Sequence, residues 1–288
     1  MEKIMQKITF TAKDGYALGG TFFNGSGGLT QPYPVLIAPA TGIKQGFYYA
    51  FAEHLSAQGY NVLCFDFRGI GASLHGALKD SQASIDDWGV YDLPAAIDQL
   101  TDMTGAEQVA IIGHSAGAQL LGVAHNYHKV ARLISVAGST GYVPKLSGRT
   151  KLLAPLMFEV LFRVSSRTLG YGATKIIGMG ENLPKHVARQ WREFCNTGQY
   201  IKYSIGKTIF DDYHDKISCP IHAFYATDDE IATRENVHDF FALYPHAQVH
   251  YHELHPADYG FDEIGHMNLF RRSYQRLWLL LVDALSED

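Results

Sequence analysis

The chain has 288 residues, of which 47% are hydrophobic and 18% are charged, and its formal net charge at pH 7 is −5. A chain of this length and composition can bury a large core as one globular domain, with or without an insertion. Its acidic balance, without any run of lysine or arginine, argues against nucleic acid or an anionic membrane surface as a partner.

Targeting and membrane signals are not expected. Residues 1–15 lack the uninterrupted apolar stretch of a signal peptide, and the late apolar segment LWLLLVDAL is too short to span a bilayer. Cys64, Cys195 and Cys219 lie far apart with no CxxC spacing, which is typical of free thiols in a reducing compartment. We therefore expect a cytoplasmic protein with no membrane span.

The first third of the chain predicts an antiparallel start that passes into strand–helix alternation. Three short β-type runs, bounded by Gly, Pro and Asn, lie at 6–11, 18–23 and 34–38. A helical pattern over 47–59, the strand-like run NVLCFDF and a helix near 88–103 come next. Such alternation is typical of a mostly parallel sheet.

The middle of the chain continues this pattern and then leaves it. QVAIIG and LISVAG predict strands, and AGAQLLGVAHNY between them predicts a helix. Residues 143–215 show helical stretches such as LLAPLMFEVLFRV and KHVARQWREFC but no convincing strand. We interpret this region as a helical insertion.

The last part returns to strands and helices. CPIHAFYA at 219–226 and AQVHYHEL predict strands, with a helix at about 235–243 between them and a long final helix over 268–285. The sequence thus predicts one α/β core made of two segments, 1–142 and 216–288, with a helical cap formed by residues 143–215.

The segment GHSAG places Ser115 between a buried strand and a helix. Gly113 and Gly117 permit a sharp turn there, which would project the serine hydroxyl from the carboxyl edge of the sheet. The start of the helix would also direct the amide of Ala116 at a developing oxyanion. Ser115 is therefore a candidate nucleophile.

A serine nucleophile needs a base and a group that orients the base. Of the 14 histidines, His266 stands in a glycine-preceded loop, DEIGHMNLF, after the last predicted strand. Asp228 and Asp229 follow the strand CPIHAFYA and supply the candidate acid. The chain order is then Ser, Asp, His.

Four segments in this order, namely GHSAG, DFRGIGAS, ATDDEIAT and GHMNLF, resemble the sequence blocks of the α/β-hydrolase superfamily. The resemblance covers nearly the whole sheet portion, and residues 143–215 lie where this superfamily places its lid. More narrowly, the chain resembles the monoacylglycerol lipase and serine aminopeptidase-like branch. The resemblance implies an α/β-hydrolase fold, a mostly parallel central sheet flanked by helices with a helical cap.

The resemblance also implies roles for individual residues. Ser115 would be the nucleophile, His266 the general base and Asp229 the orienting acid, because the family acid stands three residues beyond the place held here by Ala226. The family's usual His-Gly after the third strand is absent, and APATGIKQGF replaces it. The second oxyanion amide would then belong to Thr41 or Gly42.

The expected activity is hydrolysis of a carboxylic ester or related small acyl compound through an acyl-enzyme, without metal or organic cofactor. An acyltransferase or an amidase/peptidase would use the same three residues. A non-catalytic binding module that keeps the fold is a further alternative. The sequence leaves the acyl substrate and the oligomeric state open.

Two other groups of residues have simpler interpretations. His250, His252 and His255 could ligate a metal from one strand face, but no Cys or carboxylate partner stands at a recognisable spacing, which favours an exposed edge strand. In DFRGIGAS, we expect Asp66 and Arg68 to form a carboxylate–guanidinium pair that braces the loop.

Overall fold

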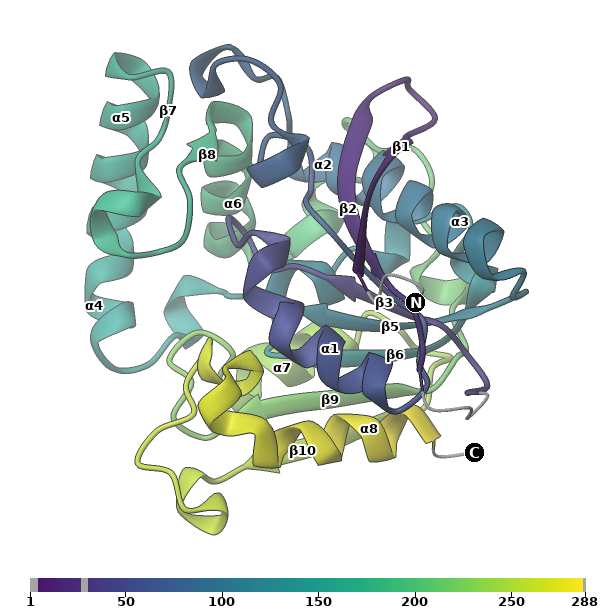
Figure 1. Ribbon diagram of the computed structural model, residues 1–288. Coiled ribbons are helices and arrows are strands. Elements are labelled where there is room, and N and C mark those ends of the chain that lie inside the picture. Colours follow the sequence, from purple (N-terminus) through teal and green to yellow (C-terminus); the bar gives the residue numbers. More distant parts are fainter. Residues whose placement is uncertain (1–4, 27–30, 287–288) are drawn as a thin grey trace.

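The computed structural model describes residues 5–26 and 31–286. We expect no signal peptide in residues 1–15, and residues 1–4 of that segment lie outside the described ranges. Helices cover both faces of one eight-stranded sheet, with α1 and α8 on one face and α3 and α7 on the other, and the insertion stands at one side (Figure 1). This is the α/β arrangement that the sequence predicts.

The strand order is β1-β2-β4-β3-β5-β6-β9-β10. The strands are β1 (Met5–Thr11), β2 (Ala17–Phe23), β3 (Val35–Ala38), β4 (Val62–Phe65), β5 (Val109–His114), β6 (Val130–Val136), β9 (Ile221–Ala226) and β10 (Val249–Leu254). β2 runs antiparallel to β1 and β4, and all other pairs are parallel. The mostly parallel sheet is confirmed, and so is the antiparallel start for β1 and β2, whereas the third predicted run, 34–38, forms β3 and pairs parallel with both of its neighbours.

Helices complete the core and form most of the insertion. The core helices are α1 (Tyr49–Ala57), α2 (Ile85–Asp87), α3 (Leu93–Thr104), α7 (Arg234–Phe241) and α8 (Trp278–Ser286). The insertion contains α4 (Gly148–Pro155), α5 (Phe162–Thr168), α6 (Lys185–Thr197) and a two-stranded ribbon of β7 (Tyr171–Gly172) and β8 (Leu183–Pro184). A π-helical stretch, Leu156–Leu161, links α4 to α5.

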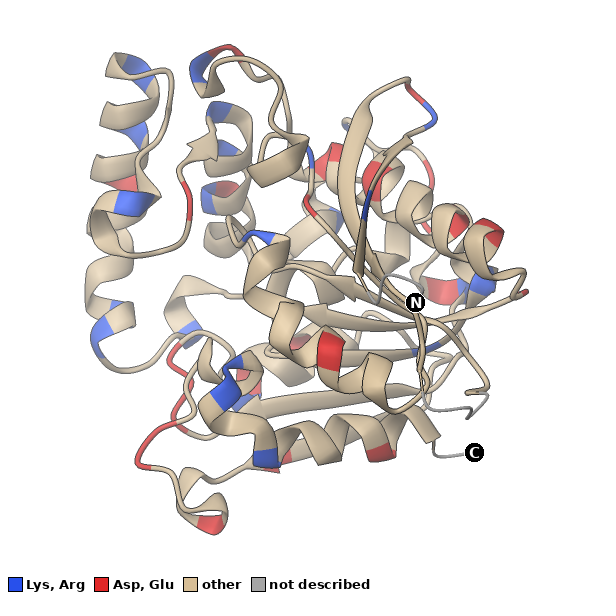
Figure 2. Ribbon diagram, in the orientation of Figure 1, with Lys and Arg blue, Asp and Glu red and all other residues tan. Residues whose placement is uncertain are grey.

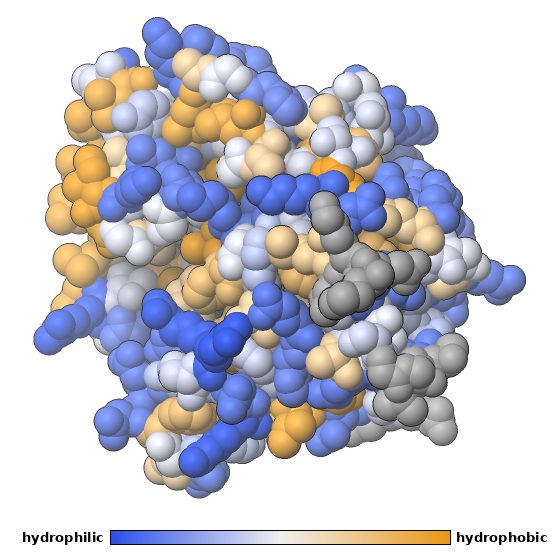
Figure 3. Space-filling view, in the orientation of Figure 1, coloured by the Kyte–Doolittle hydropathy of each residue, from blue (hydrophilic) through white to orange (hydrophobic). Residues whose placement is uncertain are grey.

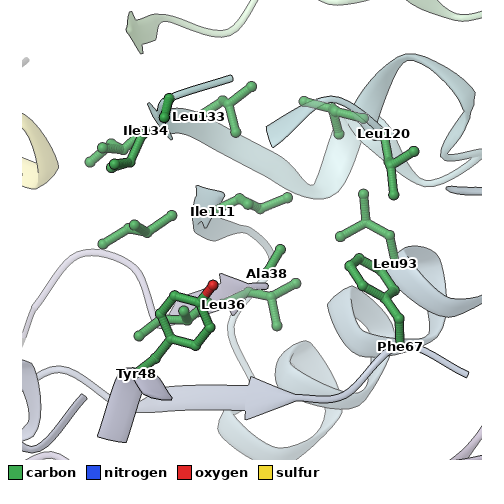
Figure 4. Packing of buried hydrophobic residues seen from close by; sticks show 14 of the residues in the cluster. Leu36, Ala38, Tyr48, Phe67, Leu93, Ile111, Leu120, Leu133 and Ile134 are labelled. Atoms are coloured by element: carbon green, nitrogen blue, oxygen red, sulfur yellow. The ribbon is translucent and has the colours of Figure 1, made fainter. Parts of the chain in front are cut away.

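The central strands are buried on both faces, which explains their continuous apolar sequences. Every residue of β3, β4 and β5 is buried. Leu36 and Ile111 pair in register between β3 and β5. Figure 4 shows their side chains packed with those of Leu93, Leu120 and Leu133. The core thus fixes the carboxyl ends of β3 and β5, where the candidate site lies.

The helix predicted from AGAQLLGVAHNY is wrong. The structure has two 3₁₀ turns instead, Ser115–Ala118 and Leu121–Val123. Glycine is a poor helix former, and Gly122 packs so closely on His214 that an added Cβ would lie 2.1 Å from its ring. Tyr213 also donates its amide to the Gly122 carbonyl. These contacts hold the segment in a non-α conformation, so the expected helix macrodipole behind Ser115 is reduced to one short turn.

The final helix is shorter than predicted. 3₁₀ turns at Asn268–Phe270 and Arg272–Leu277 precede α8, which begins at Trp278. Arg271 between these turns is extended, with φ −73° and ψ 146°, and this breaks the helix that the apolar periodicity suggests. Trp278 donates its indole N–H to the Leu269 carbonyl, so a tertiary contact fixes the break.

The predicted pair of Asp66 and Arg68 is also wrong. Asp66 accepts hydrogen bonds from the backbone and side chain of Gln45, at 2.7 and 2.8 Å, and from the Ala72 amide. Arg68 instead pairs with Asp92 at 2.7 Å and with Asp14 at 2.6 Å. The two side chains leave the end of β4 toward different partners, and each braces the loop separately.

No helix in residues 5–26 and 31–286 is both long enough and apolar enough to cross a membrane.

Candidate active site

Ser115 lies directly after β5 in a strained backbone conformation. Its φ is +47°, which is uncommon for a residue with a side chain. A Cβ added to Gly113 would lie 2.5 Å from the Ala118 backbone nitrogen, and one added to Gly117 would lie 2.1 Å from the Ala38 carbonyl oxygen. Both glycines are therefore required by close backbone approach, as the GHSAG pattern predicts.

His266 and Asp229 form a close pair across two loops. His266 Nδ1 lies 2.8 Å from Asp229 Oδ2. Asp229 follows β9 and is 2% exposed, and its other oxygen accepts the amides of Ile231 at 2.8 Å and Ala232 at 2.9 Å. Because a carboxylate only accepts, Nδ1 of His266 carries the proton. Nε2 of the neutral ring is then left to act as a base.

The pair sets the charge of both groups. Burial by itself raises the pKa of Asp229, but the His266 charge and hydrogen bond together with the two amides bring it below its ordinary value of 3.8. Burial by itself lowers the pKa of His266, but the Asp229 charge and hydrogen bond raise it above 6.5. Asp229 is therefore ionised at neutral pH and stabilises a protonated His266.

Asp228 has different partners from its neighbour. Its carboxylate accepts the backbone amides of Ile264, at 2.9 Å, and Gly265, at 3.1 Å. These two residues immediately precede His266 in the chain. Of the two candidate acids, Asp229 contacts the imidazole and Asp228 holds the loop that carries it.

Ser115 and His266 both line a cavity of about 160 Å³. Of the three predicted oxyanion residues, all within the described ranges, only Thr41 lines this cavity. Gly42 has a φ of +71°, and its carbonyl accepts the Glu181 amide at 2.8 Å. Ala116 follows Ser115 and is fully buried. The geometry favours Thr41 over Gly42 beside the serine.

The sequence analysis did not single out His114, which precedes Ser115. The side chain is fully buried, and its Nε2 lies 2.9 Å from the His266 carbonyl oxygen. Since a carbonyl only accepts, Nε2 donates and Nδ1 accepts from the Tyr48 hydroxyl, 2.8 Å away. Burial, followed by the charge of His266, lowers the pKa of His114 to about 3, so the ring stays neutral.

Tyr48 extends this connection to the loop after β3. Its hydroxyl accepts the Ala40 amide at 2.9 Å while it donates to His114. A chain of hydrogen bonds therefore joins the loop that carries Thr41 to the backbone of His266 through His114, the residue before Ser115. The position of His114 inside GHSAG was the available sequence signal, but its partners come from distant segments.

A second cavity, of about 650 Å³, is lined mostly by residues of the insertion, together with Gly141 and Ile231. It shares lining residues with the cavity at Ser115, among them Met179, Trp191 and Cys195. The two spaces are therefore neighbours, and the larger one is mostly apolar because Leu, Met, Val and Phe side chains line it. An extended apolar group attached at Ser115 would have room there.

The three cysteines are free. Cys195 lines both cavities, but burial raises the pKa of its thiol to about 12. A thiol with this pKa is protonated at neutral pH and is a weak nucleophile. Ser115 therefore has no thiol competitor in Cys195.

His250 and His252 of HYHELH lie on β10, an edge strand of the sheet, and His255 follows directly after it. His250 stacks on His222 with ring centroids 4.9 Å apart, and His252 stacks on Phe224 at 4.1 Å. In the part of the chain that the structure describes, no group of three or more His, Cys, Asp or Glu side chains is arranged to hold a metal ion. The edge-strand interpretation is confirmed, although His250 and His252 are half-buried.

Solved structures with this fold include esterases and a lipase. The Pyrococcus furiosus esterase Pf2001 aligns with a TM-score of 0.62 and 17% identity, covering 98% of this chain and 90% of its own. The Paleococcus ferrophilus monoacylglycerol lipase aligns with a TM-score of 0.59 and 14% identity, covering 93% and 98%. At these identities the likeness shows the fold.

Sequence comparisons give the family. The "Putative carbamate hydrolase RutD" of Escherichia coli O9:H4 (strain HS) is 22% identical over 226 residues, which is 75% of this chain and 81% of that protein. The family model described as "Serine aminopeptidase, S33" matches residues 34–257. Because this match takes in well over half of the chain, the protein belongs to the S33 serine aminopeptidase-like family of hydrolases, within the α/β-hydrolase superfamily.

Proposed function

We propose that this hydrolase is a serine esterase that cleaves a carboxylic ester or related acyl compound through Ser115, His266 and Asp229. The observation that carries the proposal is that His266, which pairs with the buried Asp229, lines the same cavity as Ser115. No alternative nucleophile of low pKa lines this cavity among the described residues, since the Cys195 thiol is held protonated.

In the proposed mechanism, Ser115 Oγ attacks the ester carbonyl while His266 Nε2 takes its proton. The electron pair of the carbonyl moves to oxygen, and the amides of Ala116 and Thr41 stabilise this oxyanion. The intermediate collapses, the bond to the leaving alcohol breaks, and His266 returns the proton to it. Water, activated by His266, then releases the acid from Ser115.

A panel of acyl esters, amides and carbamates of different chain length tests this function. We expect the wild type to hydrolyse esters at the highest kcat/KM and Ser115→Ala to lose this activity. Amides as best substrates would identify an amidase or peptidase. Product formation only with an added alcohol, amine or thiol would identify an acyltransferase. No turnover, together with failure of a fluorophosphonate to label Ser115, would indicate a non-catalytic binding module.

The pH dependence should report His266. Its pKa is raised above 6.5 by Asp229, and only the neutral ring is a base, so kcat/KM should fall as the pH drops through a value above 6.5. Asp229→Asn removes the main raising influence and should move the acid limb of the residual activity to lower pH. Initial rates between about pH 5 and 9 measure the acid limb of the wild type and that of the Asp229→Asn variant. An acid limb that is flat from neutral pH to about pH 5 would contradict the role of His266.

We also propose that the insertion, residues 143–215, acts as a cap that selects the acyl group, with 1–142 and 216–288 as the hydrolase core. Leu156 and Phe158 line the larger cavity. Phe162 is 2% exposed and packs on Phe158 and Trp191, with ring centroids 5.6 and 5.7 Å apart. The proposed cap therefore supplies both the wall of the cavity and its support.

Alanine substitutions in this wall should change substrate length preference. Leu156→Ala and Phe158→Ala enlarge the larger cavity and should shift the optimum toward longer acyl chains by raising their kcat/KM relative to short ones. Phe162→Ala, which acts through its neighbours, should shift it less. Steady-state rates over an ester series provide the measurement, and Leu279→Ala on α8 is the control. An unchanged optimum in all three folded variants would leave the insertion with a structural role only.

We place the protein in the cytoplasm, because three free cysteines fit a reducing compartment.

A further inference from the structure

The insertion concentrates exposed apolar side chains. Twelve large hydrophobic residues are exposed in the described part of the chain, and eight of them lie between residues 152 and 177. These eight are Leu152, Leu153, Leu156, Val160, Val164, Leu169, Ile176 and Ile177, which we call the apolar patch. Figure 3 shows hydrophobic surface along the edge of the molecule formed by α4 and α5. Clusters of this kind mark an interaction site more often than single exposed residues do.

Part of the apolar patch also lines the larger cavity. Five of its members line that cavity, namely Leu153, Leu156, Val160, Val164 and Ile177, and each is 44–58% exposed. The same cavity shares Met179 and Trp191 with the cavity at Ser115. An apolar route therefore connects the outer surface of the insertion to the proposed nucleophile.

Positive charge accompanies the apolar patch. Residues 143–215 contain eleven Lys and Arg against six Asp and Glu, a net charge of +5. The remainder contains thirteen Lys and Arg against twenty-three Asp and Glu, a net charge of −10. Figure 2 shows basic residues on α4, α5 and α6, and Lys151, Arg167 and Arg189 are exposed. The whole-chain charge of −5 conceals this asymmetry.

We propose that the apolar patch and its basic residues dock on an anionic lipid surface, and that the larger cavity receives the acyl chain of a lipid ester taken from that surface. Exposed apolar residues that enter the boundary between headgroups and acyl chains, flanked by Lys and Arg that attract anionic headgroups, are the combination that binds such surfaces. A symmetric contact with a second copy would bring two basic insertions together, so like charges oppose it. The second half of the proposal rests on the proposed esterase activity.

Vesicle binding by Ser115→Ala tests the docking without turnover. Co-sedimentation is measured with vesicles of phosphatidylcholine alone and of equal parts phosphatidylcholine and phosphatidylglycerol. We expect the protein to bind the mixed vesicles, to bind neutral vesicles at least about tenfold more weakly, and to be released from the mixed vesicles by salt. Equal binding to both compositions, or no binding to either, would overturn the proposal.

Two pairs of variants separate charge from apolar contact. In the Ser115→Ala background, Lys151→Gln with Arg167→Gln should weaken binding at least about tenfold, because each cation near an anionic surface contributes about a fivefold factor. Lys13→Gln with Lys216→Gln removes two exposed core charges and is the matched control. Leu152→Ser with Ile176→Ser should also abolish binding, whereas Leu279→Ser should not. Equal losses in variants and controls would contradict a specific face.

Two further measurements distinguish the competing outcomes. If sedimentation equilibrium shows a dimer that Leu152→Ser with Ile176→Ser dissociates, and vesicles do not bind, the patch is an interface between copies and the proposal is wrong. In the otherwise wild-type chain, hydrolysis of a soluble short ester should survive the patch variants, while hydrolysis of a long-chain ester in mixed vesicles should fall at least about tenfold. If the wild type does not hydrolyse any soluble ester, the proposed esterase activity is wrong, while the result of the vesicle-binding experiment still stands by itself.

Discussion

Replacing Ser115 with alanine is expected to lower kcat at least about a thousandfold, with the fold and the substrate affinity preserved. The serine oxygen is the atom that forms the proposed acyl-enzyme, and alanine has no group to replace it. Its φ of +47° belongs to the backbone, which Gly113 and Gly117 hold by close contacts, so alanine can occupy the same turn. Single-turnover rates measure the loss of catalysis, and circular dichroism checks that the fold is preserved.

His266→Ala should lower kcat by a similar factor. The double variant should lose little more kcat than either single variant, because neither the nucleophile nor the base contributes to catalysis without the other. Ser139→Ala is the matched control, since Ser139 lines the same cavity and should cost less than about tenfold. Losses that multiply in the double variant would show that the two residues act independently.

The second large effect is expected at Asp229. Asp229→Asn removes the negative charge that stabilises protonated His266, and its amide can donate to Nδ1 and favour the wrong tautomer of the ring. We expect a loss of about a thousandfold to ten-thousandfold in kcat with little change in KM. Asp229 also accepts the Ile231 and Ala232 amides through its other oxygen, and an asparagine whose amide nitrogen faces His266 keeps an oxygen there for both contacts.

Asp228→Asn is the matched control for this substitution. The Asp228 carboxylate accepts the amides of Ile264 and Gly265, and the oxygen of asparagine can still accept from that loop. We expect less than about a tenfold loss of kcat, with some loss of thermal stability. The opposite ranking of the two asparagine variants would show that Asp228, and not its neighbour, orients the base.

Local patterns in the sequence predicted the sheet well. Runs such as VLIA and VLCF are short, apolar and bounded by turn residues, and both form fully buried strands. The turn at Ser115 was predictable from the two glycines that flank it, although only Gly113 is required by a neighbour in the chain, Ala118, whereas Gly117 is required by its close approach to Ala38 on β3. The strands and the Gly113 contact depend on neighbours in the chain, which a sequence displays directly.

Periodicity was less reliable where tertiary contacts oppose it. AGAQLLGVAHNY has apolar residues at helical spacing, but packing of Gly122 on His214 and a hydrogen bond from Tyr213 hold it as 3₁₀ turns. The pairing of Asp66 with Arg68 failed for a related reason. Their real partners, Gln45, Asp14 and Asp92, come from other segments. Closeness in the chain did not indicate which charges would meet.

The sequence by itself determined the order of the sheet strands along the chain, the glycine-flanked turn and the candidate residue types Ser, Asp and His, because each follows from local pattern and spacing along the chain. Only the tertiary structure decided which of two adjacent carboxylates contacts His266, how Tyr48 and His114 join distant loops, and that the insertion gathers exposed apolar and basic residues on one element. Those outcomes depend on distances between segments far apart in the chain, and these are set by how the strands pair and how the helices pack.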